Sequence, residues 1–219
     1  MKKYLEVLKH CPLFQDMTEQ DFLSILSCLS PKISTYLKDQ TIFAEGDLSH
    51  YFGIVLSGTV QIVQIDYYGN KSIVTKIEPS QLFGESFAYA ETKTIPVDVI
   101  ACESTEVLLI NAQKITKSCP NACNFHNQMI FNLLKVIAKK NLIFQQKIEV
   151  TSKRSTREKL MTYLLLQAKL QNSKQFKIPY DRQELADYLE VDRSGLSAEI
   201  SKLKKEGILD CKKNYFSLQ

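Results

Sequence analysis

One short helix face carries residue types that suit hydrogen bonding to the base edges of DNA. Arg193 has a planar, forked guanidinium, which can donate two parallel hydrogen bonds to O6 and N7 of a guanine. The other residues expected on this face are short, polar or basic: Ser194, Ser197, Ala198, Ser201 and Lys202. An ordinary helical hairpin with a solvated polar face would carry similar residues, so the pattern alone leaves that alternative open.

Two short predicted helices, separated by three residues, position this face. Asp181 and Glu184 form a capping box at the start of the first helix, and Asp192 is a suitable cap for the second. Glu190 stands in the turn, where a left-handed backbone often requires glycine. The inner faces are apolar at helical spacing: Leu185, Ala186 and Leu189, then Leu196, Ile200 and Leu203. The pattern predicts a helix-turn-helix.

The flanking segments extend this motif to a winged helix. Ser155 and Glu158 form a capping box for a preceding helix, and "FKIPY" is a short extended piece. After the second helix, "GILDCKKNYFSLQ" predicts a terminal hairpin with lysines at its tip. The predicted DNA-binding set therefore also includes residues at the helix starts and on the hairpin: Arg182, Gln183, Asp192, Lys212 and Lys213.

Charge is distributed unevenly along the 219 residues. The net charge of +4 combines −4 over residues 1–118 with +8 over residues 119–219. The first range contains ten lysines and no arginine, and all four arginines of the chain follow it. A basic C-terminal part joined to an acidic N-terminal part indicates a nucleic-acid-binding module attached to a domain with another task.

Composition and motifs argue against an enzyme and against a secreted or membrane protein. The chain has only three histidines and contains no Gly-x-Ser-x-Gly, P-loop or His-Glu-x-x-His motif. Its N-terminal residues form no apolar signal region, and no apolar stretch is long enough to span a bilayer. We expect a cytoplasmic protein that is not an enzyme. An enzyme with a regulatory domain is the alternative from another class.

Three candidate metal ligands follow one another near the middle of the chain, namely Cys119, Cys123 and His126. Thiolate and imidazole suit zinc or iron, but a closed site needs a fourth ligand, such as Cys102 or a group of a partner chain. The six cysteines are scattered and include no Cys-x-x-Cys pair, which favours reduced thiols packed as small apolar side chains. Redox or metal sensing stays open as the alternative function.

The N-terminal part predicts helices followed by an antiparallel β-roll. Thr18 and Asp21 form a capping box within an opening helical segment from Lys3 to about Leu29. Short β-runs then follow, and glycine-containing turns separate them at roughly 11–12-residue spacing. Among these turns, "YYGNK" is typical of a hairpin.

A long helix is predicted from about Asn121 to Glu149. One stripe of this helix repeats like the seam of a coiled coil: Ile130, Leu134, Ile137, Asn141, Phe144 and Ile148. A second apolar stripe runs beside it: Met129, Leu133, Val136 and Ile143. The helix could simply pack on its own domain, but two apolar faces favour contact with both that domain and a second copy of the chain.

With these elements in this order, the chain resembles the Crp/Fnr superfamily of bacterial transcription regulators, named after the cyclic-AMP receptor protein and the fumarate-nitrate regulator. The resemblance covers nearly the whole chain and is carried by "EGD", "SGTV", "FGE" and "RQELADYLEVDRSGLS". It implies an α+β fold in three parts: a cyclic-nucleotide-binding-like jelly roll with N-terminal helices at 1–120, a long dimerisation helix at 121–150, and a winged helix-turn-helix at 151–219.

In nucleotide-binding members of the superfamily, the glutamate of the Phe-Gly-Glu turn holds the ribose and a later Arg-Ser pair holds the cyclic phosphate. Here Glu85 is present, but the later position is Ile95-Pro96-Val97, and Lys93 offers only a point charge. We therefore expect a small, largely apolar effector that is not a cyclic nucleotide, and a structural role for Glu85 as a helix cap or surface residue. The predicted effector pocket is Phe83, Gly84, Glu85, Lys93, Ile95, Pro96, Val97, Met129, Ile143 and Phe144.

The resemblance also implies a homodimer that binds an inverted repeat in double-stranded DNA and acts with RNA polymerase. Family members usually carry a further arginine on the recognition helix where this chain has Ala198. Arg193 is therefore expected to be the one side chain of this face that can fork onto guanine.

Overall fold

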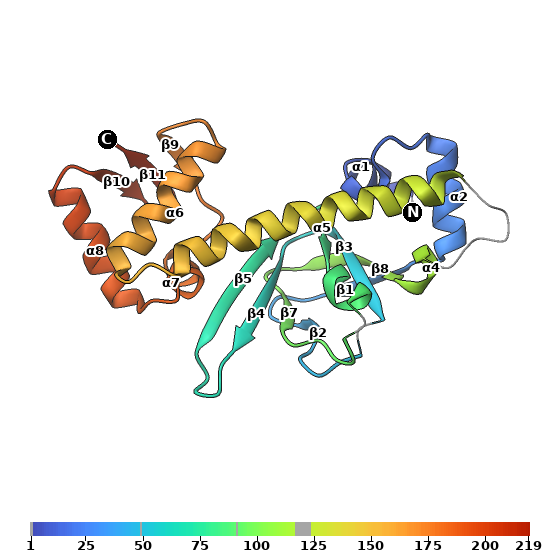
Figure 1. Ribbon diagram of the computed structural model, residues 1–219, viewed down its shortest axis with the longest axis horizontal. Helices are drawn as coiled ribbons and strands as arrows, with labels where there is room; N and C mark the ends of the chain where they lie inside the picture. The colour runs from blue at the N-terminus through green and yellow to red at the C-terminus, as the bar shows by residue number, and fades with distance from the viewer. Residues whose placement is uncertain (1, 49, 91, 117–123) are drawn as a thin grey trace. The chain divides into compact units, whose positions relative to one another are not determined.

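The computed structural model describes residues 2–48, 50–90, 92–116 and 124–219. The chain forms two compact units (Figure 1). The first comprises Met1–Gln64 and Thr75–Asn141, and the second comprises Ile65–Val74 and Leu142–Gln219. Within the described part of the chain, no helix is both long and apolar enough to cross a membrane.

The first unit contains the predicted antiparallel β-roll, except for Ile65–Val74 around the turn between β4 and β5, which belong to the second unit. Its strands are β1 Lys32–Tyr36, β2 Thr41–Phe43, β3 Tyr51–Ser57, β4 Val60–Ile65, β5 Lys71–Ile77, β6 Leu82–Phe83, β7 Asp98–Ala101 and β8 Thr105–Asn111. They form two four-stranded sheets, ordered β1-β8-β3-β6 and β2-β7-β4-β5. This finding confirms the predicted α+β fold with an N-terminal antiparallel roll.

Close packing inside the roll depends on Gly53 in β3. A Cβ atom at this position would lie 2.1 Å from Cζ of Phe83, far inside van der Waals contact. The ring of Phe83 therefore rests directly on the backbone of β3, and it also packs against Phe43, with 5.5 Å between the ring centroids. Strand β3, which carries Gly53, and strand β2, which carries Phe43, are thus held close to the segment that carries Phe83 and Glu85.

The "YYGNK" segment forms the predicted hairpin turn between β4 and β5. The carboxylate of Asp66 accepts hydrogen bonds from the backbone N–H groups of Tyr68 and Asn70, each at 2.8 Å. Gly69 adopts a left-handed φ of 83°, which glycine tolerates without steric cost. The side chain of Asp66 therefore organises the turn.

The opening segment is helical but interrupted. A 3-10 turn at Lys2–Tyr4 leads into α1 (Leu5–Lys9), and another at Pro12–Phe14 precedes α2 (Glu19–Leu29). Thr18 caps α2 as predicted, because its hydroxyl accepts a hydrogen bond from the N–H of Asp21. The prediction of one helical stretch was thus too coarse around residues 10–18, where a proline starts the second turn.

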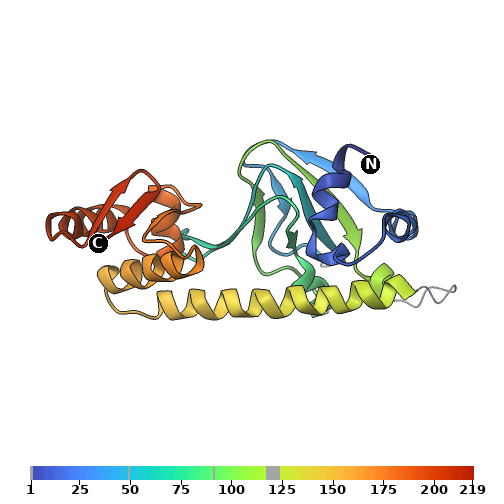
Figure 2. The ribbon, with the colours of Figure 1, turned by 90° about the horizontal axis from the view of Figure 1, so that it is seen from above.

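Helix α5 (Asn124–Thr151) is the long helix of the prediction. Met129, Leu133 and Val136 are buried in one core with α1, α2 and the roll. Figure 2 shows the first part of α5 running alongside the roll. The amide of Asn132 reinforces this contact by donating to the carbonyl oxygens of Leu13 and Gln15. Two short helices, α3 (Glu85–Tyr89) and α4 (Gln113–Thr116), complete the helices described in this unit.

Several large apolar side chains of α5 stay exposed, namely Ile130, Phe131, Leu134, Leu142, Ile143 and Ile148. Ile130, Leu134 and Ile148 follow one another at helical spacing and form an exposed apolar stripe. Ile137, a member of the predicted seam, is half-buried against the core of the first unit. Ile143, a member of the second predicted stripe, is exposed. The buried face of α5 packs against the N-terminal helices. Spacing in the sequence does not show which face of a helix packs against another element.

The second unit contains the predicted winged helix. Its elements are α6 Thr156–Leu170, β9 Gln175–Lys177, α7 Arg182–Leu189, α8 Arg193–Lys205, β10 Leu209–Lys212 and β11 Tyr215–Leu218. The three strands form an antiparallel sheet in the order β10-β11-β9. The capping boxes of Ser155 with Glu158 and of Asp181 with Glu184 are both present, as predicted.

Candidate DNA-binding face and effector site

The start of α8 is fixed by Asp192. Its carboxylate accepts a hydrogen bond from the N–H of Gly195 at 2.7 Å and another from the hydroxyl of Ser194. The hydrogen bond from Ser194 is the main reason why the pKa of Asp192 lies below its ordinary value. Asp192 and the hydroxyl of Ser194 therefore serve the helix start, although both were predicted among the DNA contacts.

The exposed face of α8 presents Arg193, and Ala198 and Lys202 are exposed beside it. The hydroxyl of Ser201 donates to the carbonyl oxygen of Ser197 at 2.9 Å, so it turns back onto its own helix. Arg193 is left as the long forked donor on this face. A face of this kind can read one guanine strongly and can lie close to the floor of the groove through its small residues.

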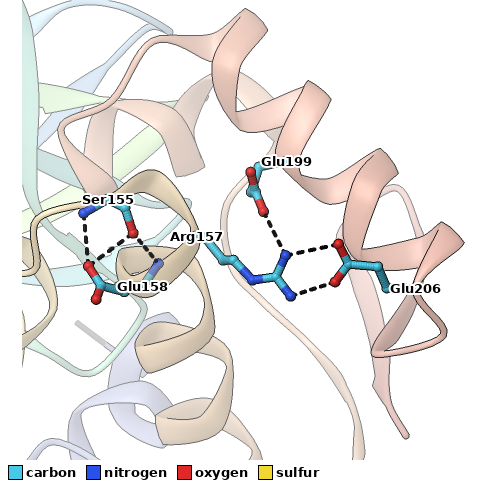
Figure 3. A network of polar contacts seen from close by, with 5 residues as sticks. All are labelled: Ser155, Arg157, Glu158, Glu199 and Glu206. Atoms are coloured by element: carbon cyan, nitrogen blue, oxygen red, sulfur yellow. Dashed lines mark hydrogen bonds and ion pairs between the residues drawn. The ribbon is translucent and has the colours of Figure 1, made fainter.

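Arg157 of α6 contacts Glu199 in α8 and Glu206 at the end of α8 (Figure 3). Its guanidinium donates to the two carboxylate oxygens of Glu206 at 3.1 and 2.5 Å and to Glu199 at 3.4 Å. Because of the hydrogen bonds from Arg157, the pKa of Glu206 is below its ordinary value. Sequence analysis missed this clamp, although Glu199 and Glu206 are seven residues apart and therefore share one face of α8.

Arg182 lies inside the winged helix, whereas it was predicted among the DNA contacts. One guanidinium nitrogen contacts Sγ of Cys211 at 3.7 Å, and the group lies 5.8 Å from the ring centroid of Phe216. Another nitrogen, Nη1, is buried and has no hydrogen-bond partner among the described residues. Nearby, Gln183 donates to Asp187 at 2.8 Å along α7. Arg182 therefore packs α7 against the strands of the wing.

The tip of the wing carries Lys212 and Lys213, and both side chains are exposed. Lys213 has a left-handed φ of 56°, as the tight turn between β10 and β11 requires. In contrast, Lys204 at the end of α8 binds the carboxylate of Asp210 at 2.7 Å. Lys212 and Lys213 are therefore free to meet phosphates, whereas Lys204 is engaged within the wing.

In the first unit, Glu85 is the charged residue of the Phe-Gly-Glu turn in the predicted effector site. Its side chain is only 1% exposed, and its two oxygens lie 2.8 and 2.9 Å from Nζ of Lys140 on α5. Lys140 also donates to the carbonyl oxygen of Leu82 at 2.7 Å. The cap of α3 is Gly84. The expectation that Glu85 is a cap or surface residue is therefore wrong, because Glu85 is buried and pairs with Lys140, whose side chain is partly exposed.

The other predicted pocket residues are spread over different environments. Phe83, Ile95 and Val97 are buried, while Lys93 and Pro96 are exposed. Met129 belongs to the core around α1 and α2. Ile143 and Phe144 belong to the second unit. Lys140, which sequence analysis did not select, is the residue of α5 that contacts the Phe-Gly-Glu turn. The sequence signal that could have identified Lys140 is its place on the helix face of Met129, Leu133 and Val136, which are apolar.

The candidate metal ligands are only partly described. Cys119 and Cys123 lie outside the described residues, His126 is buried at the start of α5, and Cys102 is half-buried. In the described ranges, no group of three or more histidine, cysteine or acidic residues could hold a metal ion. Burial raises the pKa of Cys11 to about 12, which keeps this thiol protonated and unreactive.

Comparison with known proteins matches the N-terminal roll and the C-terminal winged helix separately. A family model for the cyclic nucleotide-binding domain matches residues 33–120, and a model for the Crp-like helix-turn-helix domain matches residues 158–218. The transcriptional activator protein FnrA of Stutzerimonas stutzeri is 25% identical over 178 residues, which cover 79% of this chain and 70% of FnrA. The transcriptional activator protein anr of Pseudomonas aeruginosa is 24% identical over 177 residues, covering 78% of this chain and 70% of anr.

Solved structures share the fold. The c-di-GMP responsive global regulator CLP of Xanthomonas campestris superposes with a TM-score of 0.74 at 16% identity, over 92% of this chain and 99% of CLP. FixK2 of Bradyrhizobium japonicum superposes with a TM-score of 0.66 at 20% identity, over 86% of this chain and 92% of FixK2. Two domain matches in this order, on a β-roll followed by a winged helix, show that the chain belongs to the Crp/Fnr superfamily of DNA-binding transcription regulators, which are not enzymes.

Proposed function

We propose that the chain works as a homodimer in which the β-roll senses a small effector and thereby controls DNA binding by the winged helix. Residues 1–120 form the sensing part, 121–150 the dimerisation helix and 151–219 the DNA-binding part. The protein acts in the cytoplasm together with RNA polymerase. Its operator is an inverted repeat, because a two-fold dimer presents two equivalent recognition helices.

The exposed apolar stripe of α5 carries this proposal. Leu134 is 61% exposed and Ile148 is 65% exposed, on a helix whose other face is already buried. Exposed apolar side chains along one side of a helix favour association, and a second copy of the same helix offers a matching stripe. Sedimentation of the full chain at micromolar concentration should therefore give a dimer. A monomer at that concentration would contradict the proposal.

The environment of Glu85 supports an effector other than a cyclic nucleotide. An ammonium group has three N–H donors, and Lys140 directs its donors at the two oxygens of Glu85 and at the carbonyl oxygen of Leu82. Lys140 therefore has no donor left for a phosphate, and Lys93 is exposed. A small, largely apolar molecule is the effector class that we propose.

Isothermal titration calorimetry tests this choice. Cyclic AMP and cyclic GMP should give no heat of binding at concentrations in which a micromolar site would saturate. Micromolar binding of either nucleotide would overturn the proposed effector class, while leaving the proposals on dimerisation and DNA binding intact.

A further inference from the structure

The turn between α7 and α8 has an unfavourable backbone. Glu190 ends α7 in the left-handed conformation, with φ 55° and ψ 54°. Residues other than glycine adopt this conformation at a steric cost. The turn leads within two residues to Asp192, the cap of the recognition helix. Its conformation therefore determines the direction in which α8 leaves α7.

Two lysines from other helices hold this turn. Lys147 of α5 donates to the carbonyl oxygen of Tyr188, and Lys159 of α6 donates to those of Leu189 and Glu190, each at 3.2 Å. Three successive carbonyl groups at the end of α7 thus accept hydrogen bonds from ammonium groups. The carbonyl end of a helix carries partial negative charge, so cations stabilise it.

Lys147 makes further contacts around this turn. The residue is only 9% exposed, and its Nζ lies 4.2 Å from the ring centroid of Tyr188 and 3.5 Å from Oε1 of Glu190. Ser72 also donates to the carboxylate of Glu190, at 3.2 Å. Burial is the main reason why the pKa of Lys147 lies below its ordinary value. An apolar side chain could fill the same space without the desolvation cost of a buried charge. The buried ammonium therefore indicates a role that depends on its charge.

We propose that Lys147 is a positioning residue for DNA recognition, which fixes the α7–α8 turn to the C-terminal end of α5. Its ammonium holds the carbonyl end of α7 and the side chain of the left-handed Glu190, and so sets the direction of α8 and of Arg193. This inference rests on the DNA-reading role of α8. It adds a contact by which α5, the proposed dimerisation helix, determines the orientation of the base-reading face.

The test compares specific with random DNA. A binding site is first selected from random duplexes with the wild-type protein, and Lys147→Met is then measured on that site and on random DNA. We expect affinity for the selected site to fall by about tenfold, similar to the loss of one base contact. Affinity for random DNA should change by less than about twofold, because a buried ammonium does not neutralise a phosphate.

Lys139→Met is the matched control, because it removes the same charge from an exposed position on the same helix. It should leave the ratio of specific to random affinity unchanged. The proposal would be overturned if Lys147→Met kept its thermal transition and the wild-type ratio of specific to random affinity. That outcome includes an equal loss of affinity for both DNAs. Failure of the wild type to enrich any sequence would instead contradict the DNA-reading role itself.

Glu190→Gly keeps the test decisive if Lys147→Met does not fold. Glycine relieves the left-handed backbone but removes the carboxylate that Lys147 contacts. We expect a thermal transition at least as high as in the wild type, together with a lower ratio of specific to random affinity. A ratio equal to or above that of the wild type would show that the pair has no positioning role.

Discussion

At the scale of single residues, the DNA-binding face separates into side chains that can read bases and side chains that can meet phosphates. Arg193 is exposed on α8, whereas the hydroxyls of Ser194 and Ser201 are engaged within the helix. Lys212 and Lys213 are exposed on the wing. Base contacts give sequence preference and phosphate contacts give affinity on any sequence, so the two groups should differ when they are replaced.

Replacing Arg193 by alanine should weaken binding to a selected site by about 1–3 kcal/mol and relax the preference at one base pair. The double variant Lys212→Ala/Lys213→Ala should weaken selected and random DNA alike and reduce the slope of log affinity against log salt by about 1.8. Binding to both DNAs at several salt concentrations separates the two effects. Equal weakening of both DNAs by Arg193→Ala would make Arg193 a phosphate contact.

Glu85 is buried beside the roll, and its charge is paired with the partly exposed Lys140 of α5. Removing one partner leaves the other charge buried and uncompensated, which typically costs about 3–5 kcal/mol. We therefore expect Lys140→Met to lower the free energy of unfolding by that amount, and Glu85→Met/Lys140→Met to restore part of the loss. Chemical denaturation measures both, with Lys139→Met as the control. A double variant less stable than the single one would contradict this account.

At the scale of elements, local signals in the sequence predicted most helix starts and turns. Asp181 with Glu184, Ser155 with Glu158, and the "YYGNK" hairpin all depend on contacts within a few residues, and the structure has them. The contacts that the sequence did not reveal join distant elements. Arg157 to Glu206 and Lys140 to Glu85 span 49 and 55 residues. Spacing within one helix carries no information about its partner.

Charged residues on the exposed stripe of α5 should prevent dimerisation without unfolding the chain. We expect Leu134→Glu/Ile148→Glu to sediment as a monomer and to lose most of its affinity for a selected site, because one recognition helix binds one half-site. Both positions are more than half exposed, so the fold of each unit should persist. Lys139→Glu is the control for added negative charge. A dimer of the double variant would place the interface on another surface.

The clamp between α6 and α8 should show a characteristic pH dependence. Arg157 lowers the pKa of Glu206 in the folded chain below the ordinary 4.5, so the clamp stabilises the fold above that value. This stabilisation is lost as the pH falls through the lowered pKa, where Glu206 becomes protonated. The difference in unfolding free energy between the wild type and Arg157→Gln should therefore shrink as the medium is acidified. A difference that grows toward acid would contradict the ion pair.

At the scale of the whole molecule, the order of elements predicted a β-roll, a long helix and a winged helix. The structure contains all three, and the family models match the roll and the winged helix. The candidate effector site was predicted less well. Glu85 was selected, but its neutralisation by Lys140 was not, because the rotation of α5 depends on packing against the N-terminal helices. Sequence spacing defines the faces of a helix but not what each face meets.

The central claim is that two copies of this chain read DNA together through two α8 helices. Selection of binding sites from random duplex DNA with the 219-residue chain tests it most directly. The account predicts enrichment of an inverted repeat whose half-sites lie about one helical turn apart, bound by two chains. Enrichment of a single, unrepeated half-site bound by one chain, or no enrichment over the starting pool, would contradict it.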